Sequence, residues 1–393
     1  MDTDRSKERI YSIDFLRGVV MMIMLLDHTR DFVHTGGFDP TDLSQTNVAL
    51  FFTRWITHYC APTFVFLSGV SIYLQKQNGK STRELARFLA TRGLWLVILE
   101  FTVVRFGVTF NLDYGTGMFG QVIWAIGMSM IAMAALIYLP LRLVGAIGVV
   151  MILFHNLLDG IQVPFEAANF GQSIWIILHQ PGNIQLFGGA SSVFFLYPLI
   201  PWVGVMAAGF AFGTIYSWES ERRRKMLFKL GGAAALLFVI LRLVNFYGDP
   251  SPWTAQDTSA FTILSFLNVT KYPPSLLFLL MTLGPSIIIL GIYDRIDGKA
   301  MWQRIAITFG RVPMFFYLLQ FPLAHAMGII LNYIAGKDTP SLIFDPTQAP
   351  PDVGFSLGTT YLAWIAGLIL LYPLCYWWCN LKRRNKHWLL SYL

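Results

Sequence analysis

Apolar runs of nearly membrane-spanning length recur along the whole chain and constrain its fold more than any other feature. The 393 residues are 55% hydrophobic and 13% charged, against roughly 25% charged in an ordinary soluble domain. Such a chain cannot expose its apolar surface to water, and its runs lack the period-two alternation of membrane strands. We therefore expect one all-α, polytopic transmembrane helical bundle that forms a single domain over residues 1–393.

The apolar runs predict about ten spans, and the charges between them predict their orientation. Most of the 29 Lys and Arg residues fall in every second loop, so the positive-inside rule places both termini in the cytoplasm. These loops also explain the net charge of +7, which gives no reason to expect nucleic-acid binding. The predicted spans lie near 13–32, 48–74, 94–112, 118–139, 143–158, 191–218, 228–247, 271–293, 305–334 and 356–380.

The first span carries the most informative cluster of ionisable residues. Its apolar run, Phe15 to Leu26, rises only about 18 Å as an α-helix, whereas a bilayer core is about 30 Å thick. Either the helix stops short, or the charges at 27–31 lie inside the membrane. Charges at that depth cost about 2.5–3.5 kcal/mol each and usually serve ion pathways, proton transfer or catalysis.

Six residues of this span recur at steps of three and four and share one helix face: Asp14, Arg17, Met21, Met24, His28 and Asp31. The other faces are apolar, so this stripe should line the interior of the bundle. His28 can accept a proton near neutral pH, and Asp31, one turn further on, can orient the imidazole. Asp27 and Arg30 are also one turn apart and can neutralise each other.

The second span should face this stripe. Arg54 and His58 are four residues apart on one helix face, at about the predicted depth of His28. Ser68 and Gly69 follow, and such small residues permit close approach of helices. In the third span, Glu100 and Arg105 are further charges at membrane depth, either paired for structure or functional.

Signatures of other chemistries are absent from the sequence. No nucleotide-binding P-loop or H-E-x-x-H pair occurs. The histidines His155, His179 and His325 are too scattered along the chain to predict a zinc site, so we expect no metal. Three longer loops, near 159–190, 248–270 and 335–355, carry aromatic and acidic residues suited either to a sugar acceptor or to the membrane interface.

The string RIYSIDFLRGVVMMIMLLDH, from Arg9 to His28, resembles the opening of the heparan-α-glucosaminide N-acetyltransferase-like membrane proteins. These are the bacterial relatives of a lysosomal enzyme and are grouped with the transmembrane acyltransferases. Four further segments resemble the same branch: FFTRWITHYCAPTFVFLSG, YPLIPWVGVMAAGFAFG, TKYPPSLLFLLMTLGP and FGRVPMFFYLLQFPLAH.

The resemblance implies a helical bundle that takes acetyl-CoA from the cytosol and delivers the acetyl group to an acceptor on the far side of the membrane. In the lysosomal enzyme the catalytic histidine follows the first-helix motif, which makes His34 a second candidate beside His28. That enzyme also has a luminal region without a counterpart here, so the acceptor is left open.

Together these observations predict a transmembrane O- or N-acyltransferase, multi-pass in the bacterial cytoplasmic (inner) membrane. Its partners are the lipid bilayer, acyl-CoA and an extracytoplasmic glycan or amine; the oligomeric state is left open, a homodimer included. His28 or His34 is the expected general base. The other expected site residues are Asp27 and Asp31 beside the base, His58 with Arg54 at the thioester oxyanion, and Arg9, Arg17 and Arg311 at the CoA phosphates.

Two other functions fit the same charges. A proton-coupled secondary transporter or flippase would use the cluster to carry protons or an anionic substrate, although no inverted repeat is apparent in the sequence. A scaffold subunit without chemistry would gain nothing from burying so many ionisable groups.

Overall fold

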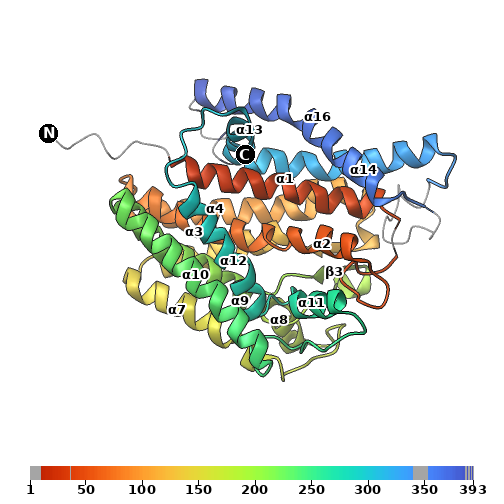
Figure 1. Cartoon of the computed structure of the whole chain (residues 1–393), viewed down its shortest axis with the longest axis horizontal. Helices are drawn as coiled ribbons and strands as arrows, with labels where there is room; N and C mark the ends of the chain where they lie inside the picture. Colours follow the sequence, from red (N-terminus) through yellow and green to blue (C-terminus); the bar gives the residue numbers. More distant parts are fainter. Residues whose placement is uncertain are drawn as a thin grey trace.

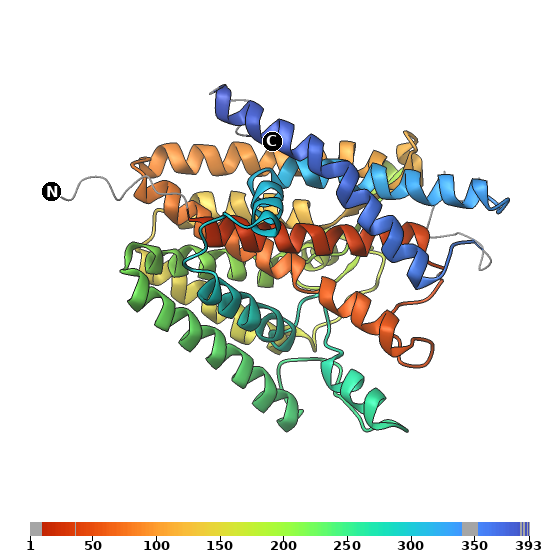
Figure 2. The same ribbon diagram turned by 45° about the horizontal axis from the view of Figure 1, so that its top comes forward.

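The structure is a computed structural model in which the polypeptide forms a bundle of helices (Figure 1). It describes residues 10–35, 37–339, 353–385, 387, 390 and 392. Most of the long helices run side by side along one direction, with α1 among them near the middle of the bundle (Figures 1 and 2).

The elements follow one another with short connections. The helices are α1 (Tyr11–Val33), α2 (Val48–Thr57), α3 (Cys60–Gln77), α4 (Thr82–Leu99), α5 (Arg105–Thr109), α6 (Val122–Leu136), α7 (Leu141–Phe154), α8 (Phe170–Leu178), α9 (Leu199–Phe212), α10 (Ser220–Val244), α11 (Ser259–Leu267), α12 (Leu276–Ile292), α13 (Met301–Arg311), α14 (Pro313–Ile334) and α16 (Leu357–Arg384). The strands are β1 (Met118–Gly120), β2 (Gly182–Leu186) and β3 (Ser191–Phe195).

The predicted all-α class is confirmed, and each predicted span contains a helix. Two spans are divided: 48–74 into α2 and α3, and 305–334 into α13 and α14, where Pro313 begins the second helix. Proline at the first turn of a helix loses no intrahelical hydrogen bond. The span predicted near 94–112 begins earlier, because Ser81 caps α4 through a reciprocal pair of hydrogen bonds with Glu84.

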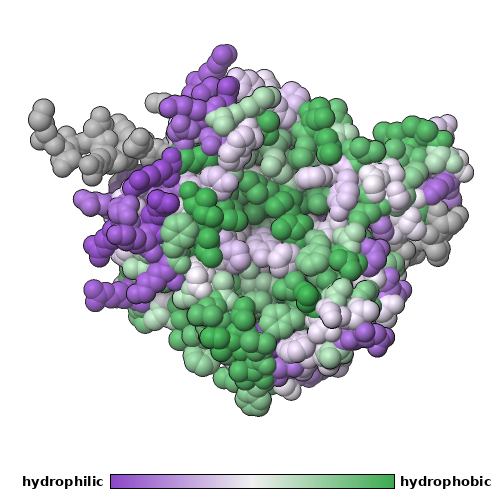
Figure 3. All heavy atoms as spheres, in the orientation of Figure 1, coloured by the Kyte–Doolittle hydropathy of each residue, from purple (hydrophilic) through white to green (hydrophobic). Residues whose placement is uncertain are grey.

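Five helical segments in the described part of the chain are long and apolar enough to cross a membrane: residues 141–158, 199–217, 220–244, 313–334 and 357–384. The outer helices carry large exposed apolar side chains; Leu243 of α10 is 60% exposed and Ile369 of α16 is 67% exposed. Figure 3 shows apolar residues across the middle of the molecule and hydrophilic residues gathered most densely at one end of the helices. Such a surface is stable against lipid rather than water.

A small sheet, not predicted from the sequence, lies between the helices. Its strand order is β1-β3-β2; β1 runs parallel to β3, and β2 runs antiparallel to it. The residues just after β1 and β3 are Gln121 and Leu196, and both line the outer cavity described below. The sheet therefore positions part of the site.

The charges of the third span contact backbone groups rather than each other. The Glu100 carboxylate accepts a hydrogen bond of 2.9 Å from the backbone N–H of Trp124, at the first turn of α6. Arg105 donates to the carbonyl oxygens of Gly117 and Asn111. Both side chains thus satisfy buried backbone groups, and Glu100 fixes the end of α6 beside the cavity.

Close contacts at glycines hold α1 in the bundle. The helix packs against α2, α3, α13, α14 and α16. A Cβ atom at Gly18 would lie 1.7 Å from the carbonyl oxygen of Ala306 in α13, and one at Gly310 would lie 1.8 Å from that of Asp14. Gly69 of α3 makes a similar contact with Met206 of α9, which confirms the close approach predicted there.

We expect the substitution Gly18→Ala to lower the thermal stability of the purified protein in detergent. The added methyl group must push α1 and α13 apart, and overpacking of this kind costs about 1–3 kcal/mol or more. Gly232→Ala on α10 is the matched control, because a Cβ there meets nothing within 4 Å. Equal unfolding temperatures for the two variants would contradict the close contact.

Candidate active site

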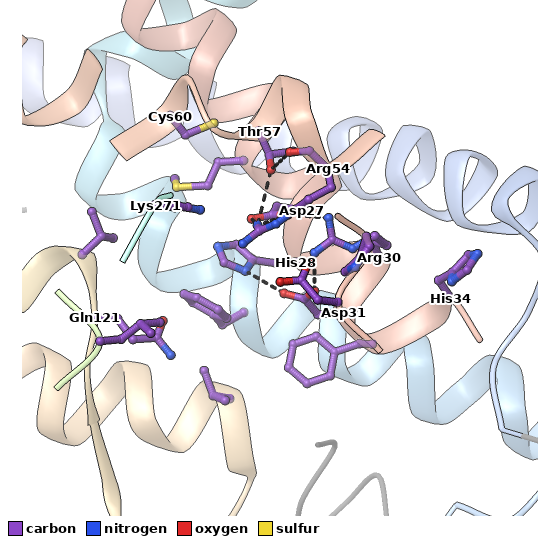
Figure 4. Close-up of a pocket in the computed structure, with 18 of the residues that line it drawn as sticks. Asp27, His28, Arg30, Asp31, His34, Arg54, Thr57, Cys60, Gln121 and Lys271 are labelled. Atoms are coloured by element: carbon purple, nitrogen blue, oxygen red, sulfur yellow. Dashed lines mark hydrogen bonds and ion pairs between the residues drawn. The ribbon is translucent and has the colours of Figure 1, made fainter. Parts of the chain in front are cut away.

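The charged end of α1 lines a cavity of about 600 Å³, here called the outer cavity. Its wall combines α1 with the loop that follows it, α2 and the start of α3. The residues just after β1 and β3, α14 and the segment before α12 complete it. Figure 4 shows the charged side chains of α1 and α2 gathered on one side of this space. The predicted residues that line it are Asp27, His28, Asp31, His34 and Arg54.

The Asp27 carboxylate forms ion pairs with two arginines, Arg54 and Arg30. One Arg54 nitrogen, Nη1, donates to both carboxylate oxygens of Asp27, at 2.7 and 2.6 Å. Arg30 approaches the same carboxylate from one turn further along α1, with Nη1 2.7 Å from Oδ1. The Asp27 side chain is only 11% exposed, so the two guanidinium groups supply the charge compensation that water would otherwise give. The predicted neutralisation of Asp27 by Arg30 is present in the structure.

His28 and Asp31 form the second pair of the cluster. The Nδ1 atom of His28 lies 3.8 Å from Oδ2 of Asp31, and Arg30 Nη2 donates to Asp31 Oδ1 at 2.6 Å. The imidazole also packs against the Phe321 ring, with centroids 4.0 Å apart. A carboxylate facing Nδ1 leaves Nε2 as the nitrogen that can exchange a proton with a substrate.

His34, the second candidate base, lies at the end of α1 and also lines the outer cavity. Figure 4 shows it well apart from the cluster around Asp27 and His28. Burial lowers the pKa of His34 below its usual range; a backbone hydrogen bond with Thr35 opposes this, and the Arg30 guanidinium adds to it. His34 is therefore neutral at physiological pH and able to accept a proton.

His58 does not belong to the described walls of either cavity. It is 4% exposed, and its ring lies 5.4 Å from that of Phe278 on α12. Its neighbour in the predicted pair, Arg54, does reach the outer cavity. The helix break near Tyr59, between α2 and α3, turns the chain at this point, which the assumption of one continuous span did not anticipate.

A second cavity, of about 640 Å³, lies toward the opposite end of α1 and is here called the inner cavity. Four cationic side chains from α1, the loop before α4, α4 and the end of α16 line it: Arg17, Lys80, Arg92 and Lys382. The loop after α3 and the end of α16 are the basic segments that the charge pattern assigns to the cytoplasmic side. The inner cavity is thus a cationic chamber on the predicted cytoplasmic side.

The three arginines predicted for the CoA phosphates have different positions. Arg17 lines the inner cavity, where it donates to Ser71 Oγ at 3.1 Å. Arg311 lies outside the described cavity walls, with Nε 3.6 Å from Oδ2 of Asp14 and its guanidinium over the Tyr11 ring. Arg9 lies outside the described residues.

The two cavities share part of their walls. Three described residues line both: Met24 from the stripe on α1, Val122 from the start of α6, and Tyr317 from α14. The Tyr317 side chain is 4% exposed, and its hydroxyl has no hydrogen-bond partner among the described residues. His28 follows Met24 by one helical turn, about 6 Å along α1. The stripe therefore runs from the inner cavity, past the shared wall, into the outer one.

Several residues of the cavities were not predicted. Lys271, Tyr272 and Tyr197 line the outer cavity, and Lys80 lines the inner one. Lys271 stands out in the sequence as one of few basic residues on the predicted outer side, which was an available signal. Tyr317 offered none, because an aromatic residue in an apolar helix is ordinarily part of the core.

A helical bundle with membrane-length apolar helices, whose cavities are lined by ionisable side chains, defines a multi-pass integral membrane protein. The sequence matches the family described as heparan-alpha-glucosaminide N-acetyltransferase, catalytic, over residues 9–243, more than half of the chain. The chain therefore belongs to this family of membrane acetyltransferases, and the predicted resemblance is confirmed. A comparison with curated proteins found no match.

Proposed function

We propose that this protein transfers an acyl group, acetyl by analogy with its family, from cytosolic acyl-CoA to an extracytoplasmic hydroxyl or amine. The observation that carries the proposal is the pair of cavities that meet at Met24, Val122 and Tyr317. One cavity is cationic on the predicted cytoplasmic side, and the other contains a histidine-carboxylate pair on the predicted outer side. A bacterial cytoplasmic membrane would supply acyl-CoA on one side and envelope glycans on the other.

The charge balance of the inner cavity supports an anionic donor. Partial burial lowers the pKa of Lys80, Glu84 opposes this, and the nearby Arg92 adds to the lowering. An anion that binds between neighbouring cations offsets their mutual repulsion and stabilises their charged forms. The phosphates of coenzyme A carry such charge, and Arg92 and Arg17 offer planar donors for phosphate oxygens.

The transfer itself follows from the residues around the shared wall. The acceptor oxygen or nitrogen attacks the thioester carbonyl carbon, so a C–O or C–N bond forms and the C–S bond breaks. His28 takes the acceptor's proton through Nε2, supported by Asp31, and releases it to solvent in the outer cavity. The coenzyme leaves as a thiolate and takes a proton from cytosolic water.

Tyr317 is the proposed oxyanion donor. Tyr317 lines both cavities, and its buried hydroxyl has no hydrogen-bond partner among the described residues. Such a donor can bind the oxygen that becomes negative in the transition state. Arg54, predicted for this role with His58, is engaged with Asp27, and His58 is not among the residues that line the described cavities. Lys271, which also lines the outer cavity, adds positive charge to the same space.

The outer cavity also favours a polar acceptor with a flat face. Tyr197 and Tyr272 pack together in its wall with centroids 5.2 Å apart, and Gln121 adds an amide group. Sugar rings bind to such combinations of aromatic faces and hydrogen-bonding side chains. We therefore place glycans and amino sugars first among the acceptors to be tested.

Purified protein in proteoliposomes tests the proposal directly. Labelled acetyl-CoA is supplied on one side, candidate amino sugars and glycans on the other, and acetylated product is measured with the free coenzyme released. We expect product only when donor and acceptor are on opposite sides, in the orientation with the inner cavity facing the donor. Transport of an intact solute without release of free coenzyme would contradict the proposal.

Charge reversal in the inner cavity should weaken donor binding. We expect Lys80→Glu and Arg92→Glu each to raise the KM for acetyl-CoA about tenfold or more with a smaller change in kcat, since a hydrogen bond to a charged group contributes about 1.5–3 kcal/mol. Lys299→Glu, on an exposed loop, is the matched control. Unchanged KM values in both cavity variants would place the donor elsewhere.

A further inference from the structure

A cluster of two histidines and an aspartate lies outside both cavities. His155 begins the helical turn after α7, Asp159 follows that turn, and His179 ends α8. One potential ligand atom from each of the three side chains lies within 4.8 Å of the other two. The spacing of the histidines along the sequence gives no reason to expect a metal site. The fold nevertheless brings His155 and His179 together, because the chain folds back between them.

The histidine rings of this cluster are buried and have unused nitrogen atoms. His155 and His179 are each 2% exposed. Neither ring nitrogen of His155 has a hydrogen-bond partner among the described residues, and neither has Nδ1 of His179. Buried polar groups are nearly always satisfied, so an imidazole with two unsatisfied nitrogens requires an explanation such as an ion. Here the unsatisfied ring stands beside two further ligand groups.

The distances fit a metal after a small adjustment. Nε2 of His179 lies 3.0 Å from Oδ1 of Asp159, and two ligands of a tetrahedral zinc ion with bonds of about 2.0–2.1 Å are separated by roughly 3.3 Å. The ring centroids of His155 and His179 are 5.9 Å apart and the ring planes are inclined at 65°. Both rings can therefore direct a nitrogen at one point. A metal would replace the proton now shared by Nε2 and Oδ1.

Supporting contacts orient the carboxylate. Asn156 Nδ2 donates to the second Asp159 oxygen, Oδ2, at 2.8 Å, which leaves Oδ1 facing His179. The Asn156 oxygen accepts from the backbone N–H of Leu276 at 2.9 Å, so the cluster is tied to the start of α12. Outer contacts of this kind commonly fix metal ligands in place.

We propose that His155, Asp159 and His179 bind a divalent transition-metal ion, with zinc the best match to two imidazoles and one carboxylate. The ion would join the ends of α7 and α8 and stabilise the segment that leads into β2. This proposal does not depend on the acyltransferase function, because the three residues lie outside the described walls of both cavities.

Metal binding by the full-length protein in detergent tests the proposal. Protein stripped with a chelator is titrated with Co²⁺ while the visible absorption of tetrahedral cobalt is recorded, and Zn²⁺ is then added to displace it. We expect one ion per chain, and a rise in unfolding temperature with Zn²⁺ that the chelator reverses. A wild-type protein that shows neither the absorption nor the stabilisation would overturn the proposal.

Substitutions assign the ligands. His155→Gln, Asp159→Asn and His179→Gln should each weaken Co²⁺ binding at least tenfold and remove the zinc-dependent rise in unfolding temperature. Glu166→Gln, in the same loop with an exposed side chain, is the control and should bind cobalt as the wild type does. Cobalt binding that survives all three ligand substitutions would place the metal elsewhere and refute the site.

Discussion

Replacement of His28 by alanine should lower the rate of acetyl transfer about 10²–10⁴-fold, the usual contribution of a general base. The imidazole lines the outer cavity one helical turn from the shared wall, and Asp31 faces its Nδ1 atom. Steady-state kinetics with saturating acetyl-CoA measure the effect. The KM for the donor should change little, because His28 lies outside the described wall of the inner cavity.

His34→Ala is the matched variant, since the two candidates are six positions apart in the same segment. His34 lies ten residues beyond Met24, about 15 Å if the helix continued, and Figure 4 shows it apart from the charged cluster. We expect a loss of less than tenfold. A large loss in His34→Ala together with near-normal rates in His28→Ala would exchange their roles.

Asp27→Ala should be the most destabilising substitution in the outer cavity. It leaves Arg30 and Arg54 facing each other without their shared carboxylate, and removal of one partner from a buried ion pair costs about 3–5 kcal/mol. Thermal unfolding in detergent, with intrinsic fluorescence as the signal, measures the change. The expected result is a clear fall in the unfolding temperature.

Asp31→Ala provides the comparison for this effect. Asp31 also contacts Arg30, but half of its side chain is exposed, so water can replace much of the interaction. We expect a markedly smaller change in stability, although activity should fall because Asp31 faces His28. Equal destabilisation by the two substitutions would contradict the central position of Asp27.

The first helix was the part of the site that could best be predicted from the sequence. A period of 3.6 residues places Arg17, Met24 and His28 on one face whatever the rest of the fold does, and these residues do line the cavities. The ion pair of Asp27 with Arg30 also followed from local spacing. The helical fold and the membrane location followed from composition. In lipid, backbone polar groups must be satisfied within the protein, so only helices and closed barrels can span the membrane.

Contacts between distant segments could not be predicted in the same way. The cavities are also lined by residues from helices and loops far along the chain, namely Tyr317, Lys271 and Lys382. Spacing within one helix does not indicate which helices become neighbours. Arg311 shows the same limit: it is basic and near the predicted cytoplasmic face, yet it pairs with Asp14. The small sheet was missed because its strands are only three to five residues long.

The shared wall formed by Met24, Val122 and Tyr317 bears on how such a protein keeps the membrane sealed. If the donor stays in the inner cavity and the acceptor in the outer cavity, only the few atoms of the acyl group have to pass between these three side chains. Neither the donor nor the acceptor would then cross the bilayer, so catalysis would require no opening wide enough to leak ions. Room at these three positions would then limit the length of the transferred chain.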